Sequence, residues 1–158
     1  MNRSPFSIVQ YGMPESVSDQ HTANTPADRT QRIALVVDDE PGVVVLCTKL
    51  LMKAGYEVQQ AQNGKEALEI IHGQKPDIVF LDLMMPVMDG FEVCERVKKD
   101  PETSDIVIAV ISALDTDLDK QYAFSLGANF YFPKPFYPKQ FLNEILPTVE
   151  TALKSGSE

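Results

Sequence analysis

The residues with the clearest chemical potential each follow an apolar run of the chain. They are two acids after the first run, one acid after the third, a serine after the fourth and a lysine after the fifth: Asp38, Asp39, Asp82, Ser112 and Lys134. Three carboxylates that lie close together raise one another's pKa unless a cation lies among them. An all-oxygen donor set with room for water favours Mg²⁺. The pattern therefore predicts a magnesium site with Asp82 as nucleophile toward an activated phosphoryl group.

In this interpretation Lys134 neutralises charge on the oxygens of the transferred group, and Ser112 donates a hydrogen bond to it. Each residue taken singly also has a purely structural explanation. An acidic pair before a helix is most often a solvated N-cap, Asp82 and Ser112 can cap loops or helices, and a lysine before proline is usually on the surface. Their shared position after four separate runs favours one common site over four coincidences.

The apolar runs predict five β-strands: 33–37, 56–61, 77–81, 106–111 and 129–132. Longer stretches of helical periodicity separate them, which is typical of βαβ units and of a doubly wound α/β sandwich. Only the run 56–61 is followed by no reactive side chain, as expected for an edge strand. We therefore expect a parallel sheet of order 2-1-3-4-5, which brings the ends of the other four strands together.

Start and stop signals delimit the helices between these strands. Asn63 is the expected N-cap of the second helix, with Glu66 three residues later. Asp89 is the expected N-cap of the third helix, which ends at Asp100 because Pro101 follows it.

The last two helices carry apolar residues at helical spacing. The fourth begins at 115–119 and bears Leu118, Tyr122 and Leu126. The last has four apolar residues in phase: Phe141, Ile145, Val149 and Leu153. Pro147 lies within that pattern and predicts a kink or pause near Leu146.

The composition is typical of a soluble globular domain, with 44% hydrophobic and 23% charged residues. A net charge of -9 disfavours binding to nucleic acid or anionic membranes, and no stretch reaches the length of a membrane span. The two cysteines, Cys47 and Cys94, match no zinc or redox spacing. We therefore expect reduced thiols in a cytoplasmic protein.

Residues 1–30 are polar and lack apolar periodicity, so we expect a flexible extension. The domain itself is expected over 31–154, followed by a short tail at 155–158. The sequence shows no basic helix-turn-helix or other effector region. We therefore expect either a stand-alone domain or part of a longer protein, and the leader that starts at Met1 slightly favours the first.

Four segments resemble the signatures of response regulator receiver domains, the phospho-accepting modules of two-component signalling. They are VVDDEP at 36–41, FLDLMMPVMDG at 80–90, VISA at 110–113 and GANFYFPKPF at 127–136. Taken together, these motifs are highly specific. The resemblance covers about residues 32–153 and implies the flavodoxin-like fold of a chemotaxis receiver.

The resemblance also implies roles for the acidic residues. Asp82 would take a phosphoryl group from a phosphohistidine on a sensor histidine kinase or a histidine phosphotransfer protein. Asp39 would bind Mg²⁺ directly and Asp38 largely through water. The backbone carbonyl of Met84 would be a further ligand.

The remaining residues would respond to the phosphoryl group. Ser112 and Lys134 would contact its oxygens, and the bond between Lys134 and Pro135 is expected to be cis. Tyr131 matches the family's switch aromatic, although an ordinary strand residue would look the same in sequence. Inward movement of Tyr131 would alter the surface of the fourth helix, fifth strand and fifth helix, to which a downstream protein effector would bind.

Such a protein is a signalling switch rather than an enzyme. It would catalyse only its own phosphoryl uptake and slow autodephosphorylation. Met84 stands two residues after Asp82 and offers no amide or acid to orient a hydrolytic water. We therefore expect modest self-dephosphorylation.

Two other functions fit the same fold less well. A Mg²⁺-dependent phosphohydrolase with an aspartyl nucleophile commonly has a second acid at the position of Met84 and needs room for a capping domain. A flavodoxin-type FMN binder needs a Ser, Thr or Gly loop after the first strand, where this chain has DDEP.

Overall fold

The computed structural model describes residues 30–156, with side chains described as far as Leu153. The extension expected at 1–30 lies outside the described residues except for Thr30, as do the last two residues of the expected tail. Within this described part, no helix is both long and apolar enough to cross a membrane.

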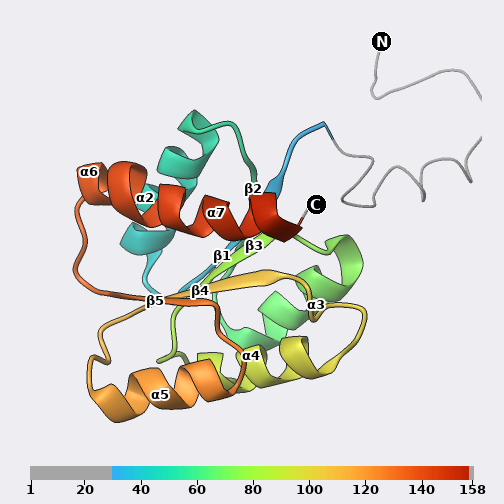
Figure 1. The fold of residues 1–158 in the computed structure, drawn as a ribbon. Coiled ribbons are helices and arrows are strands. Elements are labelled where there is room, and N and C mark those ends of the chain that lie inside the picture. Colours follow the sequence, from blue (N-terminus) through green and yellow to red (C-terminus); the bar gives the residue numbers. More distant parts are fainter. Residues whose placement is uncertain (1–29, 157–158) are drawn as a thin grey trace, which may run out of the picture. The chain divides into compact units, whose positions relative to one another are not determined.

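One sheet of five parallel strands forms the centre of the fold, in the order β2-β1-β3-β4-β5 (Figure 1). The strands are β1 (Ile33–Val37), β2 (Glu57–Ala61), β3 (Ile78–Leu81), β4 (Val107–Ser112) and β5 (Phe130–Pro133). The predicted fold class and strand order are confirmed. Strands β1, β3 and β4 are buried along their whole length, because helices cover both faces of the sheet.

Six α-helical segments flank the sheet in the described range. They are α2 (Pro41–Lys53), α3 (Gly64–Gln74), α4 (Gly90–Lys99), α5 (Asp117–Ser125), α6 (Pro138–Gln140) and α7 (Leu146–Gly156). The N-caps predicted at Asn63 and Asp89 are confirmed, since each side chain accepts a hydrogen bond from the backbone N–H three residues later. Helices α2, α6 and α7 cover one face of the sheet, and α3, α4 and α5 cover the other (Figure 1).

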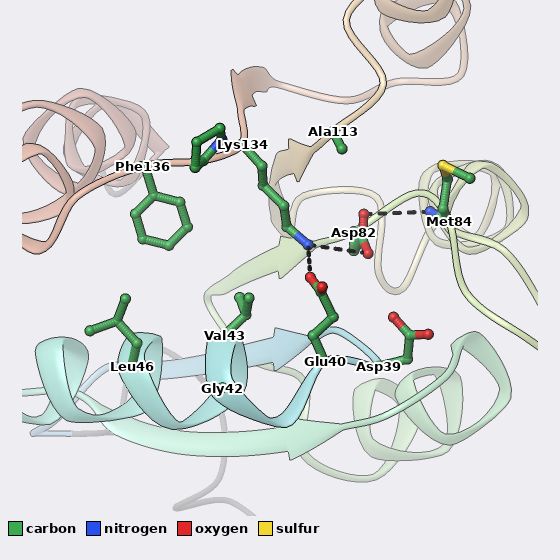
Figure 2. Close-up of a pocket in the computed structure, with 11 residues that line it drawn as sticks. Asp39, Glu40, Gly42, Val43, Leu46, Asp82, Met84, Ala113, Lys134 and Phe136 are labelled. Carbon is green, nitrogen blue, oxygen red and sulfur yellow. Dashed lines mark hydrogen bonds and ion pairs between the residues drawn. The ribbon is translucent and has the colours of Figure 1, made fainter.

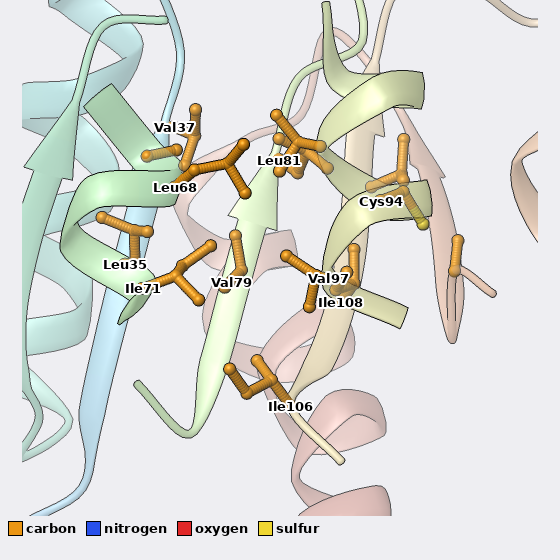
Figure 3. Packing of buried hydrophobic residues seen from close by; sticks show 14 of the residues in the cluster. Leu35, Val37, Leu68, Ile71, Val79, Leu81, Cys94, Val97, Ile106 and Ile108 are labelled. Atoms are coloured by element: carbon orange, nitrogen blue, oxygen red, sulfur yellow. The ribbon is translucent and has the colours of Figure 1, made fainter. Parts of the chain in front are cut away.

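Each face of the sheet has its own apolar core. Alternate residues of β1 point to opposite faces: Leu35 and Val37 join the core under α3 and α4, while Ala34 and Val36 join the core under α2 and α7. Figure 3 shows the first core, where Ile71 of α3 packs against the sheet. Burial of one large aliphatic side chain contributes about 1.5–3 kcal/mol, so the two cores fix the strand ends in place.

The last helical segment is interrupted where Pro147 predicts a kink. A π-helical turn (η2, Phe141–Ile145) precedes α7, whose second residue is Pro147. Proline lacks an N–H and its ring crowds the carbonyl four residues earlier, so a wider turn avoids the clash. Phe141, Ile145 and Val149 remain buried in the same phase.

Helix α5 differs from its neighbours in burial. Leu118 and Tyr122, two of the apolar residues that mark it in the sequence, are 76% and 53% exposed, and Leu126 is only partly buried. Ala123 is the buried residue of this helix. Helix α5 therefore packs through a small residue and leaves large apolar side chains on the outside.

Candidate functional site

The carboxyl ends of β1 and β3 place two buried aspartates at the same edge of the sheet. The Asp38 N–H donates to the Ala61 carbonyl at 3.1 Å, and the Asp82 N–H donates to the Val37 carbonyl at 3.0 Å. Only 3% of Asp38 and 6% of Asp82 is exposed. Asp39 is exposed, and one carboxylate oxygen from each of the three aspartates lies within 4.8 Å of the others. The predicted convergence of the three acids is therefore present.

Lys134, directly after β5, supplies positive charge to this cluster of three aspartates, which we call the acidic group. Its ammonium lies 2.8 Å from Asp38 Oδ2. It also lies 2.9 Å from Glu40 Oε1 and 3.4 Å from Asp82 Oδ2 (Figure 2). Its backbone N–H donates to the Ser112 carbonyl at 2.9 Å, which ties the lysine to the end of β4. The predicted cis bond after Lys134 is confirmed.

Burial and neighbouring charges act together on the two central ionisable groups. Burial raises the pKa of Asp82, Lys134 lowers it and Asp38 raises it, and the net shift is upward. For Lys134 burial acts to lower the pKa, but its hydrogen bonds to Asp38 and Glu40 outweigh burial, and the pKa is raised. The ammonium therefore stays charged at neutral pH, and the carboxylates around it outnumber it.

The loop after β3 holds the Asp82 carboxylate through its backbone. The Leu83 N–H donates to Oδ1 at 2.8 Å and the Met84 N–H lies 3.4 Å from the same oxygen, while Oδ2 faces Lys134. The Gly90 N–H donates to the Leu83 carbonyl at 3.0 Å, which closes the loop against the start of α4. A Cβ on Gly90 would lie 2.2 Å from the Asp82 carbonyl oxygen, so this closure requires glycine.

Ser112 and Tyr131 meet at the loop that follows β4. The Ser112 side chain is fully buried, and its Oγ accepts a hydrogen bond from the Leu114 N–H at 3.2 Å. The Tyr131 hydroxyl donates to the Leu114 carbonyl, and burial is the largest cause of its raised pKa. These two predicted residues are thus connected through Leu114, and the Ser112 side chain also acts directly on the Tyr131 hydroxyl, where it lowers the pKa.

The acidic group opens into a pocket of about 790 Å³ whose other wall is apolar. Asp39, Glu40, Asp82 and Lys134 line its polar part. Apolar side chains from α2 and from the segment leading to α6 line the rest: Val43, Leu46, Pro135 and Phe136. Met84 lies at the rim, with 59% of its surface exposed. A ligand can therefore reach the Asp82 carboxylate from outside.

The oxygen donors of this group fit a magnesium ion. Hard carboxylate ligands beside an open pocket suit Mg²⁺, which prefers oxygen and keeps part of its water shell. The three aspartate oxygens are close enough to share one ion, and two of the aspartates are buried. Met84, whose backbone carbonyl is the further predicted ligand, lines the same pocket.

Glu40 contacts Lys134, although the sequence pattern predicted no role for it. It is the N-cap residue of α2, and its side chain makes no capping hydrogen bond. The sequence feature that could have marked Glu40 is its position directly after the acidic pair and before Pro41. That signal predicts a helix cap rather than contact with a lysine 94 residues away.

The chain resembles known proteins over most of its length. The family model described as response regulator receiver domain matches residues 34–146. The chain is 39% identical over 111 residues to the DNA-binding dual master transcriptional regulator RpaA of Synechocystis sp., covering 70% of this chain and 46% of RpaA. It is 40% identical over 106 residues to the alkaline phosphatase synthesis transcriptional regulatory protein PhoP of Bacillus subtilis, covering 67% and 43%. The chain thus spans about half the length of the curated relatives it matches.

Solved structures agree with this family match. A putative response regulator from Chloroflexus aurantiacus is 33% identical, with a TM-score of 0.70 over 77% of this chain and 99% of that chain. The chemotaxis response regulator CheY4 of Vibrio cholerae is 32% identical, with a TM-score of 0.71 over 76% of this chain and 99% of that chain. Motifs, topology and family match coincide: the chain belongs to the response regulator receiver domain family.

Proposed function

We propose that this chain is the phosphoryl-accepting receiver of a two-component phosphorelay, with Asp82 as the acceptor. The position of Asp82 carries the proposal: its carboxylate is buried, lies within 4.8 Å of two further acids and contacts Lys134. Phosphoryl transfer depends on positioning and on positive charge around the transferred group, and this edge of the sheet supports both. Membership of the receiver family supports the same role.

Oδ2 of Asp82 is the oxygen that attacks, because Oδ1 already accepts the Leu83 N–H. As the new O–P bond forms, the P–N bond of the donor phosphohistidine breaks. Its electron pair returns to the imidazole, whose other nitrogen carries a proton, so that neutral imidazole leaves. Lys134 moves onto the phosphoryl oxygens, and the product is an acyl phosphate on Asp82.

Asp39 would bind Mg²⁺ directly, Asp38 would bind it largely through water, and the Met84 carbonyl would be a further ligand. When bound, the ion supplies positive charge to the phosphoryl oxygens and reduces repulsion between the two anionic reactants. The excess of carboxylates over the one ammonium of Lys134 supports the need for a further cation.

The switch runs through Leu114. Phosphorylation adds negative charge and acceptor oxygens at Asp82, which draw the Ser112 hydroxyl away from the Leu114 N–H. Tyr131 already donates to the Leu114 carbonyl in this structure, so loss of the Ser112 bond changes the loop that holds the Tyr131 hydroxyl. Phosphorylation thereby shifts the population between two states of similar energy instead of creating a new one.

The output surface lies on α5, β5 and the last helices. Leu118, Tyr122 and Phe124 on α5 are 76%, 53% and 47% exposed. The rings of Phe124 and Tyr131 lie 6.3 Å apart, so movement of Tyr131 reaches this apolar surface. Three large apolar side chains exposed on one nine-residue helix favour a protein as the downstream effector.

A sensor histidine kinase or histidine phosphotransfer protein is the proposed donor, and the site of action is the cytoplasm. The net charge of -9 argues against direct binding of nucleic acid or anionic membranes by this chain. RpaA is named as DNA-binding, but the match covers only 46% of that protein. Its name therefore does not assign DNA binding to these residues.

The protein acts as a signalling switch whose reactions are phosphoryl uptake and slow loss of its own phosphoryl group. Met84 supports the slow loss, since its thioether cannot orient a water molecule for attack on the acyl phosphate. Its side chain is exposed at the rim of the pocket that opens onto Asp82, which supports this expectation.

Small phosphodonors test this proposal without a known kinase. The protein is incubated with acetyl phosphate and Mg²⁺, and its intact mass is measured. We expect wild type to gain one phosphoryl group, as does Asp105→Asn, whose replaced side chain is 70% exposed. Asp82→Asn and chelator-treated wild type should gain none. Uptake by Asp82→Asn at the wild-type rate would reject Asp82 as the acceptor.

A further inference from the structure

Glu40 lies closer to the site lysine than the proposed phosphoryl acceptor does. The Lys134 ammonium is 2.9 Å from Glu40 Oε1 and 3.4 Å from Asp82 Oδ2. Figure 2 shows the Glu40 side chain reaching from the start of α2 to the tip of Lys134. In this structure the lysine is therefore held chiefly by Glu40 and by Asp38, at 2.8 Å.

The backbone around Glu40 directs its side chain to the lysine. The Glu40 N–H donates to Asp38 Oδ1 at 2.9 Å, and its carbonyl accepts the N–H groups of Val43 and Val44 at the start of α2. A helix N-terminus attracts carboxylates, yet the Glu40 side chain makes no capping hydrogen bond. Its carboxylate reaches instead to Lys134, whose side chain is only 12% exposed.

The three carboxylates around Lys134 differ in how freely they can release it. Asp38 and Asp82 are buried, and each also accepts a backbone hydrogen bond. The Glu40 side chain is longer and 63% exposed, so water can replace the lysine as its partner. Glu40 is thus the partner that Lys134 can leave at the lowest cost in free energy.

We infer that Glu40 is a positioning residue that restrains Lys134 at its resting position, 2.9 Å from Glu40 and 3.4 Å from Asp82, and thereby slows phosphoryl uptake. This inference rests on the proposed function of Asp82. Once the phosphoryl group is in place, Lys134 contacts its oxygens and Glu40 no longer restrains the lysine. Loss of Glu40 therefore raises the rate of uptake and leaves the rate of acyl phosphate hydrolysis unchanged.

Two substitutions separate the restraint from simple charge repulsion of the donor. Glu40→Ala removes both the charge and the contact. Glu40→Asp keeps the charge but shortens the side chain, and aspartate at an N-cap position turns toward the helix N–H groups. Glu69→Gln, at an exposed position on α3, changes the net charge as Glu40→Ala does but lies outside the residues of this site.

Initial rates of uptake from phosphoramidate with Mg²⁺ test the inference, with thermal denaturation to verify folding. We expect both Glu40 variants to react about two- to fivefold faster than wild type, the range set by the strength of an exposed ion pair. Glu69→Gln should react at the wild-type rate. After removal of the donor, hydrolysis should proceed equally fast in all four proteins.

Other outcomes would overturn the inference. A faster rate in Glu40→Ala alone would assign the effect to charge repulsion, and unchanged or slower rates in both variants would exclude a restraint. Faster hydrolysis in the Glu40 variants would indicate a general disturbance of the site and also reject it. No uptake by wild type would reject the proposed function as well. Normal uptake by wild type, with both Glu40 variants reacting no faster than wild type, would reject this inference alone.

Discussion

The hydroxyl of Tyr131, on β5, donates a 2.5 Å hydrogen bond to the backbone carbonyl of Leu114, in the loop after β4. The Leu114 N–H in turn donates to Ser112 Oγ at 3.2 Å. Leu114 therefore connects the buried serine at the end of β4 to the aromatic ring beside α5. A group that competes for the Ser112 hydroxyl would alter this chain of hydrogen bonds.

Tyr131→Phe removes the hydroxyl from this chain and keeps the ring. We expect phosphoryl uptake close to the wild-type rate and a loss of about 1 kcal/mol in stability, the usual contribution of one hydrogen bond. Beryllofluoride, a phosphoryl mimic, should change amide hydrogen exchange at Leu114 in wild type and much less in the variant. An undiminished change in hydrogen exchange in Tyr131→Phe would show that the hydroxyl has no role in the switch.

Met84→Asn places an amide two residues after the acceptor, where it can orient a water molecule toward the acyl phosphate. One added hydrogen bond in the transition state should speed hydrolysis by about tenfold. The measurement is the decay of the phosphorylated mass after donor removal. Met52→Asn is the matched control, since Met52 is also exposed, at 62%, but lies on α2. Equal decay in Met84→Asn and wild type would show that this position does not limit hydrolysis.

The raised pKa of Asp82 makes its ionisation unfavourable to folding. Because the pKa is higher in the folded protein, its contribution to stability is full below the ordinary value of 3.8 and is lost as pH rises through the folded value. Without Mg²⁺, Asp82→Asn should therefore be more stable than wild type at neutral pH, by roughly 1 kcal/mol, a usual single-site effect. Urea denaturation in a chelator measures the gain, which should shrink as pH falls toward 3.8. An equal gain in Asp105→Asn would assign it to net charge instead.

Gly90→Ala tests the loop that carries the acceptor. Its Cβ would lie 2.2 Å from the Asp82 carbonyl oxygen and 2.9 Å from Leu83 Cα, both backbone atoms. We expect a loss of about 2 kcal/mol or more in urea denaturation, together with slower phosphoryl uptake. Gly73→Ala is the control, because a Cβ there meets no atom within 4 Å. That substitution within α3 should stabilise the protein by about 0.5–1 kcal/mol. Similar effects of the two substitutions would contradict the described closure of the loop.

The sequence predicted the sheet and the convergence of the site because both follow from local patterns. The segments that form β1, β3 and β4 are buried at every position, as expected for strands covered on both faces, and are apolar except for Ser112 at the end of β4. Because β1 and β3 are parallel neighbours, their carboxyl ends lie at the same edge of the sheet. Asp38 and Asp82 therefore lie at that edge regardless of their side-chain conformations. The caps at Asn63 and Asp89 were also readable, since they depend on residues three apart.

The features that the sequence did not predict depend on contacts between distant residues. Glu40 bonds to Lys134 because the sheet brings residues 94 positions apart together and because its side chain turns away from its own helix. Leu118 and Tyr122 have the spacing of a helical face, yet the close packing of Ala123 leaves them outside. Residue type and spacing alone predict neither the direction of the Glu40 side chain nor the exposed face of α5.

The most direct test of the central claim is to locate the acyl phosphate on the chain. The protein is phosphorylated with acetyl phosphate and Mg²⁺, reduced with borohydride, digested and mapped by mass spectrometry. Reduction converts an aspartyl phosphate to homoserine, and we expect homoserine at position 82 only, with none formed when a chelator is present. Homoserine at another aspartate, or a yield at 82 that does not depend on Mg²⁺, would contradict the account.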